Sequence, residues 1–202
     1  MKHKMSNITQ KWVEVLKPFT GNYYVKASAS ELSKKSGVPQ QSCSRILNKL
    51  SEMKLISYEL NGKNKLFYID LDNENSSFLF NLVENQKGID FNLNNFEISK
   101  LIGKILKYCS SLIVFGSYAY GQQKKTSDLD LIILDCKNKK KVNELVEMFL
   151  IEVNVHYFSF DKFNILLEKG DFLGREIYKN HILFGDTSKV IFSFLEGKKW
   201  LR

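Results

Sequence analysis

The sequence predicts an α/β (α+β) chain with two parts of different character. Over residues 1–72, helical periodicity is followed by two short strand-like runs, whereas from about residue 96 helix and strand patterns alternate. Alternation of this kind is typical of a small mixed sheet flanked by helices. We therefore predict two domains, residues 1–72 and 96–202, joined by a connector over residues 73–95 in which residues 78–83 form a short amphipathic helix.

The composition excludes several classes of protein. Of the 202 residues, 44% are hydrophobic and 26% are charged, which excludes a disordered, collagen-like or disulfide-rich chain. No apolar run approaches the roughly 18–20 residues of a membrane-spanning helix, and none follows the basic N-terminus as in a signal peptide. Cys43, Cys109 and Cys136 lie too far apart for the paired spacing of a zinc or redox motif. We expect a cytoplasmic protein with reduced thiols and no membrane contact.

The net charge of +8 is unevenly distributed along the chain. Residues 1–72 hold 12 Lys and Arg against 6 Asp and Glu, whereas residues 73–202 hold 18 against 16. A basic part joined to a nearly neutral part indicates that the first part binds a polyanion and that the second part has a different function.

The first part begins with helical patterns that carry clear start and stop signals. Apolar residues from Ile8 to Leu16 share one helical face, and Pro18 ends that helix. Ser28 and Glu31 have the spacing of a capping box, which opens a second helix through Lys35. Gly37 follows where a helix must end, and Pro39 fits the first turn of a third helix that runs to about Lys54.

A β-hairpin is predicted next, because Asn61-Gly62 separates two strand-like runs. From Ser28 to Asp70, this order of elements resembles the winged helix-turn-helix of prokaryotic transcription regulators. The resemblance implies that polar residues of the third helix and the hairpin tip contact duplex DNA. These residues are Gln41, Ser44, Arg45, Asn48, Lys63 and Lys65. The other interpretation is a solvated helix face on a protein-interaction module.

The second part contains a pattern that points to phosphate and metal chemistry. Gly116-Ser117 follows a buried strand over 110–115, and Ser127-Asp128-Leu-Asp130 opens the strand over 129–134. A Gly-Ser turn after a strand presents backbone amides to anions. Two aspartates at i and i+2 of a strand share one face and can bind the same divalent cation. The alternative interpretation is that the two aspartates are merely solvent-exposed residues at the end of a strand.

Residues 96–186 resemble the nucleotidyltransferase superfamily related to DNA polymerase β, and specifically its minimal nucleotidyltransferases. The resemblance implies that Asp128 and Asp130 are catalytic and bind the metal, and that Gly116 and Ser117 bind the nucleotide phosphates. Tyr120 departs from the family, since many relatives carry Arg or Lys there. Lys124 and Lys125 precede the aspartates and could offset triphosphate charge.

The third carboxylate of this family has no clear counterpart in the chain. On the strand predicted over 151–158, the alternation places Glu152, Asn154 and His156 on one face. Asn154 matches the position of the family acid, but an amide is no base. We therefore leave three possibilities open: Glu152 as the third catalytic acid, His156 as a base, or no such group.

The leading hypothesis is a transferase dependent on Mg²⁺ or Mn²⁺. It would move a nucleotidyl group from an NTP, with ATP expected, to a hydroxyl of a protein, a tRNA or a small molecule. The alternative is a catalytically degenerate domain that acts as a nucleotide sensor, or as an antitoxin-like partner, in a DNA-binding regulator. Relatives in this family often act within toxin–antitoxin pairs. The aromatic residues near the C-terminus, Phe192, Phe194 and Trp200, either pack back onto the protein or form a homodimer contact.

Overall fold

The computed structural model describes residues 9–70, 73–124 and 126–196. The chain divides into two compact units, Met1–Val83 and Glu84–Arg202. All three cysteines are free thiols. Within the described ranges, no helix is both long enough and apolar enough to cross a membrane.

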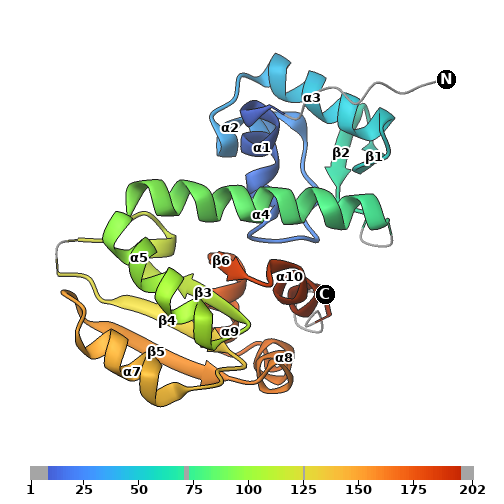
Figure 1. Cartoon of the computed structure of the whole chain (residues 1–202). Coiled ribbons are helices and arrows are strands. Elements are labelled where there is room, and N and C mark those ends of the chain that lie inside the picture. The colour runs from blue at the N-terminus through green and yellow to red at the C-terminus, as the bar shows by residue number, and fades with distance from the viewer. Residues whose placement is uncertain (1–8, 71–72, 125, 197–202) are drawn as a thin grey trace, which may run out of the picture. The chain divides into compact units, whose positions relative to one another are not determined.

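The N-terminal unit contains helices followed by an antiparallel hairpin (Figure 1). Its elements are α1 (Gln10–Leu16), a 3-10 turn (Lys17–Phe19), α2 (Ala29–Ser36), α3 (Gln40–Glu52), β1 (Ser57–Asn61), β2 (Asn64–Tyr68) and the first half of α4 (Glu74–Asn94). Ile8, predicted to begin the first helix, lies outside the described residues. The buried face of α3 includes Cys43, Leu47 and Leu50, which are fully buried.

Local signals set the boundaries of α2 as predicted, whereas α1 ends at Leu16 before Pro18, and Pro39 is the N-cap of α3. Ser28 and Glu31 form a complete capping box at the start of α2, and Gly37 ends α2 with a φ of 70°. The hairpin differs from the prediction in the position of its turn. The two-residue loop is Gly62-Lys63, with Gly62 at a φ of 61°, while Asn61 pairs with Asn64. Glycine at the first loop position supplies the positive φ that such a turn requires.

Helix α4 overturns the prediction of a short helix over 78–83 followed by an irregular, Asn-rich segment. It runs without interruption over Glu74–Asn94, and the two units divide inside it. Gly88 explains part of the difference, because a Cβ at this position would lie 3.1 Å from the Leu183 carbonyl oxygen and 3.5 Å from the Phe184 ring. Gly88 therefore allows close packing against a strand, although glycine weakens a helix.

The C-terminal unit contains a four-stranded sheet and its helices (Figure 1). Its further elements are α5 (Phe96–Ile105), a 3-10 turn (Leu106–Tyr108), β3 (Ser111–Phe115), α6 (Gly116–Ala119), β4 (Leu129–Leu134), α7 (Lys139–Glu147), β5 (Val153–Phe158), α8 (Phe160–Lys169), α9 (Phe172–Lys179), β6 (Ile182–Gly185) and α10 (Thr187–Glu196). The strand order is β5-β4-β3-β6. β3 is antiparallel to β4 and β6, whereas β4 and β5 are parallel, so the sheet is mixed as predicted.

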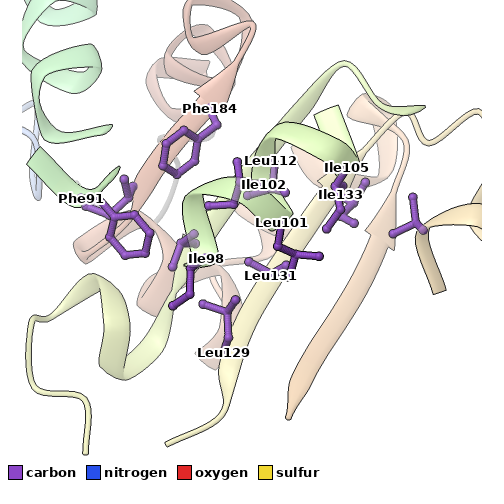
Figure 2. Packing of buried hydrophobic residues seen from close by; sticks show 13 residues of the cluster. Phe91, Ile98, Leu101, Ile102, Ile105, Leu112, Leu129, Leu131, Ile133 and Phe184 are labelled. Atoms are coloured by element: carbon purple, nitrogen blue, oxygen red, sulfur yellow. The ribbon is translucent and has the colours of Figure 1, made fainter. Parts of the chain in front are cut away.

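One face of this sheet carries the hydrophobic core shown in Figure 2. Alternate residues of β3 and β4 pack there against α5, and Phe91 of α4 contacts the ring of Phe184 with the ring centroids 5.9 Å apart. The core residues are Phe91, Ile98, Leu101, Ile102, Ile105, Leu112, Val114, Leu129, Leu131, Ile133, Val142, Ile182 and Phe184. Strict alternation along β3 and β4 directs the remaining side chains, including Asp130, to the opposite face.

Helices α8 and α10 were not predicted. Ser159 caps α8 by accepting from the Lys162 amide, and Gly170 ends it at a φ of 57°. Phe194 of α10 is fully buried and packs edge-on against Tyr178, whereas Phe192 is 60% exposed. The C-terminal aromatic residues thus divide between a packed and an exposed position, and Trp200 lies outside the described residues.

Candidate active site

The site is built on the turn that leaves β3. Gly116 follows Phe115 directly and has a φ of 67°, a conformation that L-residues with a side chain rarely adopt. A Cβ at Gly116 would overlap the Oδ2 atom of Asp130. Glycine at this position therefore lets the Asp130 carboxylate reach the start of α6. The first amides of a helix have no intrahelical acceptor, so this turn is suited to bind an anion.

The register of the sheet brings three side chains together. Phe115 is paired with Asp130 across the antiparallel ladder, and Asp130 is paired with Asn154 across the parallel one. The Asn154 amide donates a hydrogen bond from Nδ2 to Oδ1 of Asp130, over 3.2 Å. Asp130 and Asn154 are both half-buried, so this contact is partly protected from water.

Asp128 and its loop border the same end of β4. Asp128 is exposed and precedes Asp130 by two residues, immediately before the strand. The loop before it is fixed by a hydrogen bond of 2.8 Å from the Lys124 amide to the Ser127 hydroxyl. Lys124 itself is exposed, and Lys125 lies outside the described residues.

Strand β5 places an amide, that of Asn154, beside Asp130. Glu152 is exposed and lies just before β5, where its carbonyl oxygen accepts from the Leu129 amide over 2.9 Å. His156 is exposed, with its ring centroid 6.0 Å from that of Phe115. In the described part of the chain, no group of three or more His, Cys, Asp or Glu side chains is arranged to hold a metal ion. The structure thus unites Gly116, Asp130 and Asn154 without a third acid.

Tyr120, at the C-terminal end of α6, has a hydrogen-bond partner. Its hydroxyl donates to the Glu176 carboxylate over 3.3 Å. Burial raises the pKa of Tyr120, and the Glu176 carboxylate raises it further. Tyr120 is therefore a neutral hydrogen-bond donor and not a cation, so it cannot supply the charge that Arg or Lys would bring.

The residues predicted to bind DNA lie together on the N-terminal unit. Gln41 and Arg45 are exposed on α3, and Lys63 is exposed in the hairpin loop. Asn48 is half-buried and accepts a hydrogen bond of 2.9 Å from Lys65 Nζ. Ser44 is half-buried on the same helix. A hollow of about 270 Å³ lies between α3 and the hairpin. Its lining includes Ser44, Asn48, Lys63 and Lys65.

Comparison with known proteins gives a family match within the C-terminal unit. A four-stranded mixed sheet with an aspartate beside a Gly-Ser turn matches what nucleotidyl transfer requires, namely amides for phosphate and carboxylates for a metal. Residues 91–186 match the family model of the nucleotidyltransferase domain. This match supports the nucleotidyltransferase superfamily and, in general terms, nucleotidyl transfer from an NTP. No curated protein and no solved structure matches the chain.

Proposed function

We propose that the C-terminal unit binds an NTP, with ATP as the expected substrate, and transfers a nucleotidyl group to a hydroxyl acceptor. The new bond joins the acceptor oxygen to the α phosphorus, pyrophosphate leaves, and the hydroxyl proton passes to a base. One observation carries this proposal: the Asp130 carboxylate lies against Gly116, at the start of the turn within the matched domain. The carboxylate that we propose as a metal ligand and the turn that we propose to bind phosphate are thereby adjacent. The acceptor class remains the one expected from the sequence, a hydroxyl of a protein, a tRNA or a small molecule.

The residues fit a single Mg²⁺ or Mn²⁺ ion. Asp128 and Asp130 supply oxygen ligands from one edge of β4, and hard divalent cations prefer such ligands together with waters and phosphate oxygens. When bound, the ion would neutralise phosphate charge and polarise the phosphorus that is attacked. Gly116 and Ser117 would hold the phosphates through the first amides of α6.

The proton of the attacking hydroxyl needs an acceptor near Asp130. Glu152 and His156 belong to the same segment as Asn154, and both side chains are exposed. A carboxylate can accept the proton directly, and histidine can do so near neutral pH. Glu152 is the residue that we propose as the third catalytic group, and His156 is the alternative.

The experiment combines Mg²⁺-dependent nucleotide binding with transfer of label from an α-³²P NTP in a lysate of the source organism. The full chain should bind the NTP and label a protein, a tRNA or a small molecule. Asp128→Asn combined with Asp130→Asn should remove both binding and labelling, since both metal ligands lose their charge. Asn138→Asp, at the opposite end of β4, serves as a charge-change control and should retain both. Labelling that persists in the double variant would refute the site.

We also propose that the N-terminal unit is a winged helix-turn-helix that binds duplex DNA. In support, α2 and α3 precede the β1–β2 hairpin, and Ala27 pairs with Phe67 to add a third strand segment beside it. The exposed Gln41 and Arg45 side chains on α3 have the donors that read base edges. Lys63 in the hairpin loop is placed for contact with a phosphate.

A second candidate function follows from Asn154. An amide at the register position beside Asp130 removes a carboxylate where the family usually has one, which favours a degenerate domain. In this case the unit would bind the nucleotide without transfer and act as a sensor, or as an antitoxin-like partner, for a DNA-binding regulator. Mg²⁺-dependent NTP binding without labelling of any acceptor would support this function over the first.

A further inference from the structure

The contact between Asn154 and Asp130 restricts how the aspartate can bind cations. A carboxylate only accepts hydrogen bonds, so the Asn154 atom facing it is the amide nitrogen. The amide thus occupies one lone-pair direction of Oδ1, while Oδ2 faces Gly116. A divalent ion bound at Oδ2 leaves the Asn154 contact intact and lies on the side of the turn at Gly116.

The charges at this site are too few for two protein-bound ions. Two metal ions that share a substrate lie about 3.5–4 Å apart, so they repel strongly unless several carboxylates surround them. Asp128 and Asp130 supply two negative charges, Glu152 lies exposed just before β5, and the described residues contain no cluster of three metal-binding side chains. The residue paired with Asp130 on β5 is Asn154, whose neutral amide adds no negative charge.

We propose that Asn154 is a positioning residue that holds Asp130 in a site for one divalent ion per bound nucleotide. The inference rests on the proposed function, namely that this edge of β4 binds an NTP. Asn154 fixes the Asp130 carboxylate through Oδ1 and leaves Oδ2 for the ion beside Gly116. An aspartate in place of Asn154 would remove the hydrogen bond, add one negative charge and supply a ligand oxygen for a second ion.

The test counts Mn²⁺ ions bound to the full chain together with an ATP analogue that has a methylene bridge between the α and β phosphorus atoms. Equilibrium dialysis gives the number of ions per bound nucleotide, and electron paramagnetic resonance shows spin coupling when two Mn²⁺ ions are neighbours. The wild-type chain should bind one ion, without coupling. Asn154→Asp should bind two ions that are coupled. Asn138→Asp adds the same charge at the α7 N-cap, where aspartate also caps, and should bind one ion.

The positioning role has its own readout. Asn154→Ala should keep one ion per nucleotide but weaken Mn²⁺ binding about tenfold, because Asp130 loses the charge-assisted hydrogen bond that orients it. Circular dichroism confirms that each variant is folded. An unchanged Mn²⁺ affinity in Asn154→Ala, or a single ion in folded Asn154→Asp, would overturn the proposal. Two ions in the wild-type chain would overturn it and leave the proposed function intact, whereas absence of nucleotide binding would refute both.

Discussion

His181 and Glu84 form a fully buried pair in the C-terminal unit, with Nε2 of the imidazole 3.1 Å from Oε1 of the carboxylate. The other ring nitrogen lies 2.8 Å from the Ile177 carbonyl oxygen. Carbonyl and carboxylate oxygens only accept, so both ring nitrogens of His181 face hydrogen-bond acceptors. Lys87 Nζ lies 2.8 Å from the second carboxylate oxygen, and Glu84 thus contacts both the ammonium group and the imidazole ring. This cluster ties the C-terminal half of α4 to the segment between α9 and β6.

Removing the Glu84 charge should destabilise the C-terminal unit strongly. Glu84→Gln leaves the Lys87 ammonium without its buried counter-charge and His181 beside a neutral amide, and loss of one partner of a buried ion pair typically costs about 3–5 kcal/mol. Glu97→Gln is the matched control, because its pair with Lys100 is exposed and exposed pairs contribute about 0–1 kcal/mol. Urea unfolding at pH 7 measures both changes. Equal effects of the two substitutions would contradict the role of the buried cluster.

The same cluster predicts a loss of stability in acid. Burial alone would raise the pKa of Glu84, but Lys87 and His181 outweigh burial and lower the pKa from 4.5 to about 2. Since the pKa is lower in the folded than in the unfolded chain, the stabilisation is complete above pH 4.5 and is lost as the pH falls toward 2. Unfolding free energies measured between pH 7 and pH 3 should fall more steeply in the wild type than in Glu84→Gln. Parallel profiles of the two proteins would show that Glu84 does not contribute to the pH dependence of the unfolding free energy.

DNA binding should depend on the exposed cations of α3 and the hairpin loop. Arg45→Ala should weaken binding of the full chain to its duplex by about 1–3 kcal/mol if Arg45 reads a base edge. Lys63→Ala should instead weaken binding to all sequences and lower the salt slope by about 1. Fluorescence anisotropy at several salt concentrations measures both effects. Lys107→Ala, an exposed cation of the C-terminal unit, is the control. Absence of binding at low salt would assign the N-terminal unit to protein interaction.

Gly116 should be intolerant of a side chain. Gly116→Ala introduces a Cβ into the space of the Asp130 carboxylate at a positive φ, so we expect nucleotide binding to weaken at least about tenfold. Gly103→Ala is the matched control on α5, where a Cβ meets no atom within 4 Å. It should stabilise the helix by up to about 1 kcal/mol and leave binding unchanged. Isothermal titration with Mg²⁺ and the NTP distinguishes the two. Normal binding by Gly116→Ala would exclude this turn from the phosphate site.

The role of Glu152 separates binding from chemistry. Glu152→Gln should abolish labelling from the radioactive NTP while Mg²⁺-dependent binding survives, because Asp128 and Asp130 remain intact. His156→Gln should retain labelling if Glu152 is the base. Full labelling by Glu152→Gln, together with its loss in His156→Gln, would assign the proton transfer to the histidine.

Periodicity and turn chemistry predicted much of this fold because they act locally. The capping box at Ser28, the left-handed Gly37 and the buried strands β3 and β4 follow from residues close in sequence. Helix α4 could not be predicted in the same way. Its Asn-rich half lacks helical propensity, and Gly88 is favourable there because Leu183 and Phe184, distant in sequence, pack against it.

The candidate site shows the same limit. Two aspartates at i and i+2 indicated a shared face, and the alternation of β5 placed Asn154 among three candidates. Which of the three lies beside Asp130 depends on the parallel register between β4 and β5, which no local pattern specifies. The buried Glu84–His181 pair joins residues 97 positions apart, so no local pattern could predict it.

The division of the chain inside α4 determines where it can be cut. A fragment that ends at residue 72 would lack the buried Leu79, Phe80 and Val83, and Tyr23 would lose the Phe80 ring that packs edge-on at 5.5 Å. A fragment that begins at residue 96 would lack Glu84 and leave His181 buried without its anion. We therefore expect truncation at the predicted connector to destabilise both fragments, so that a fragment without activity would say little about the full chain.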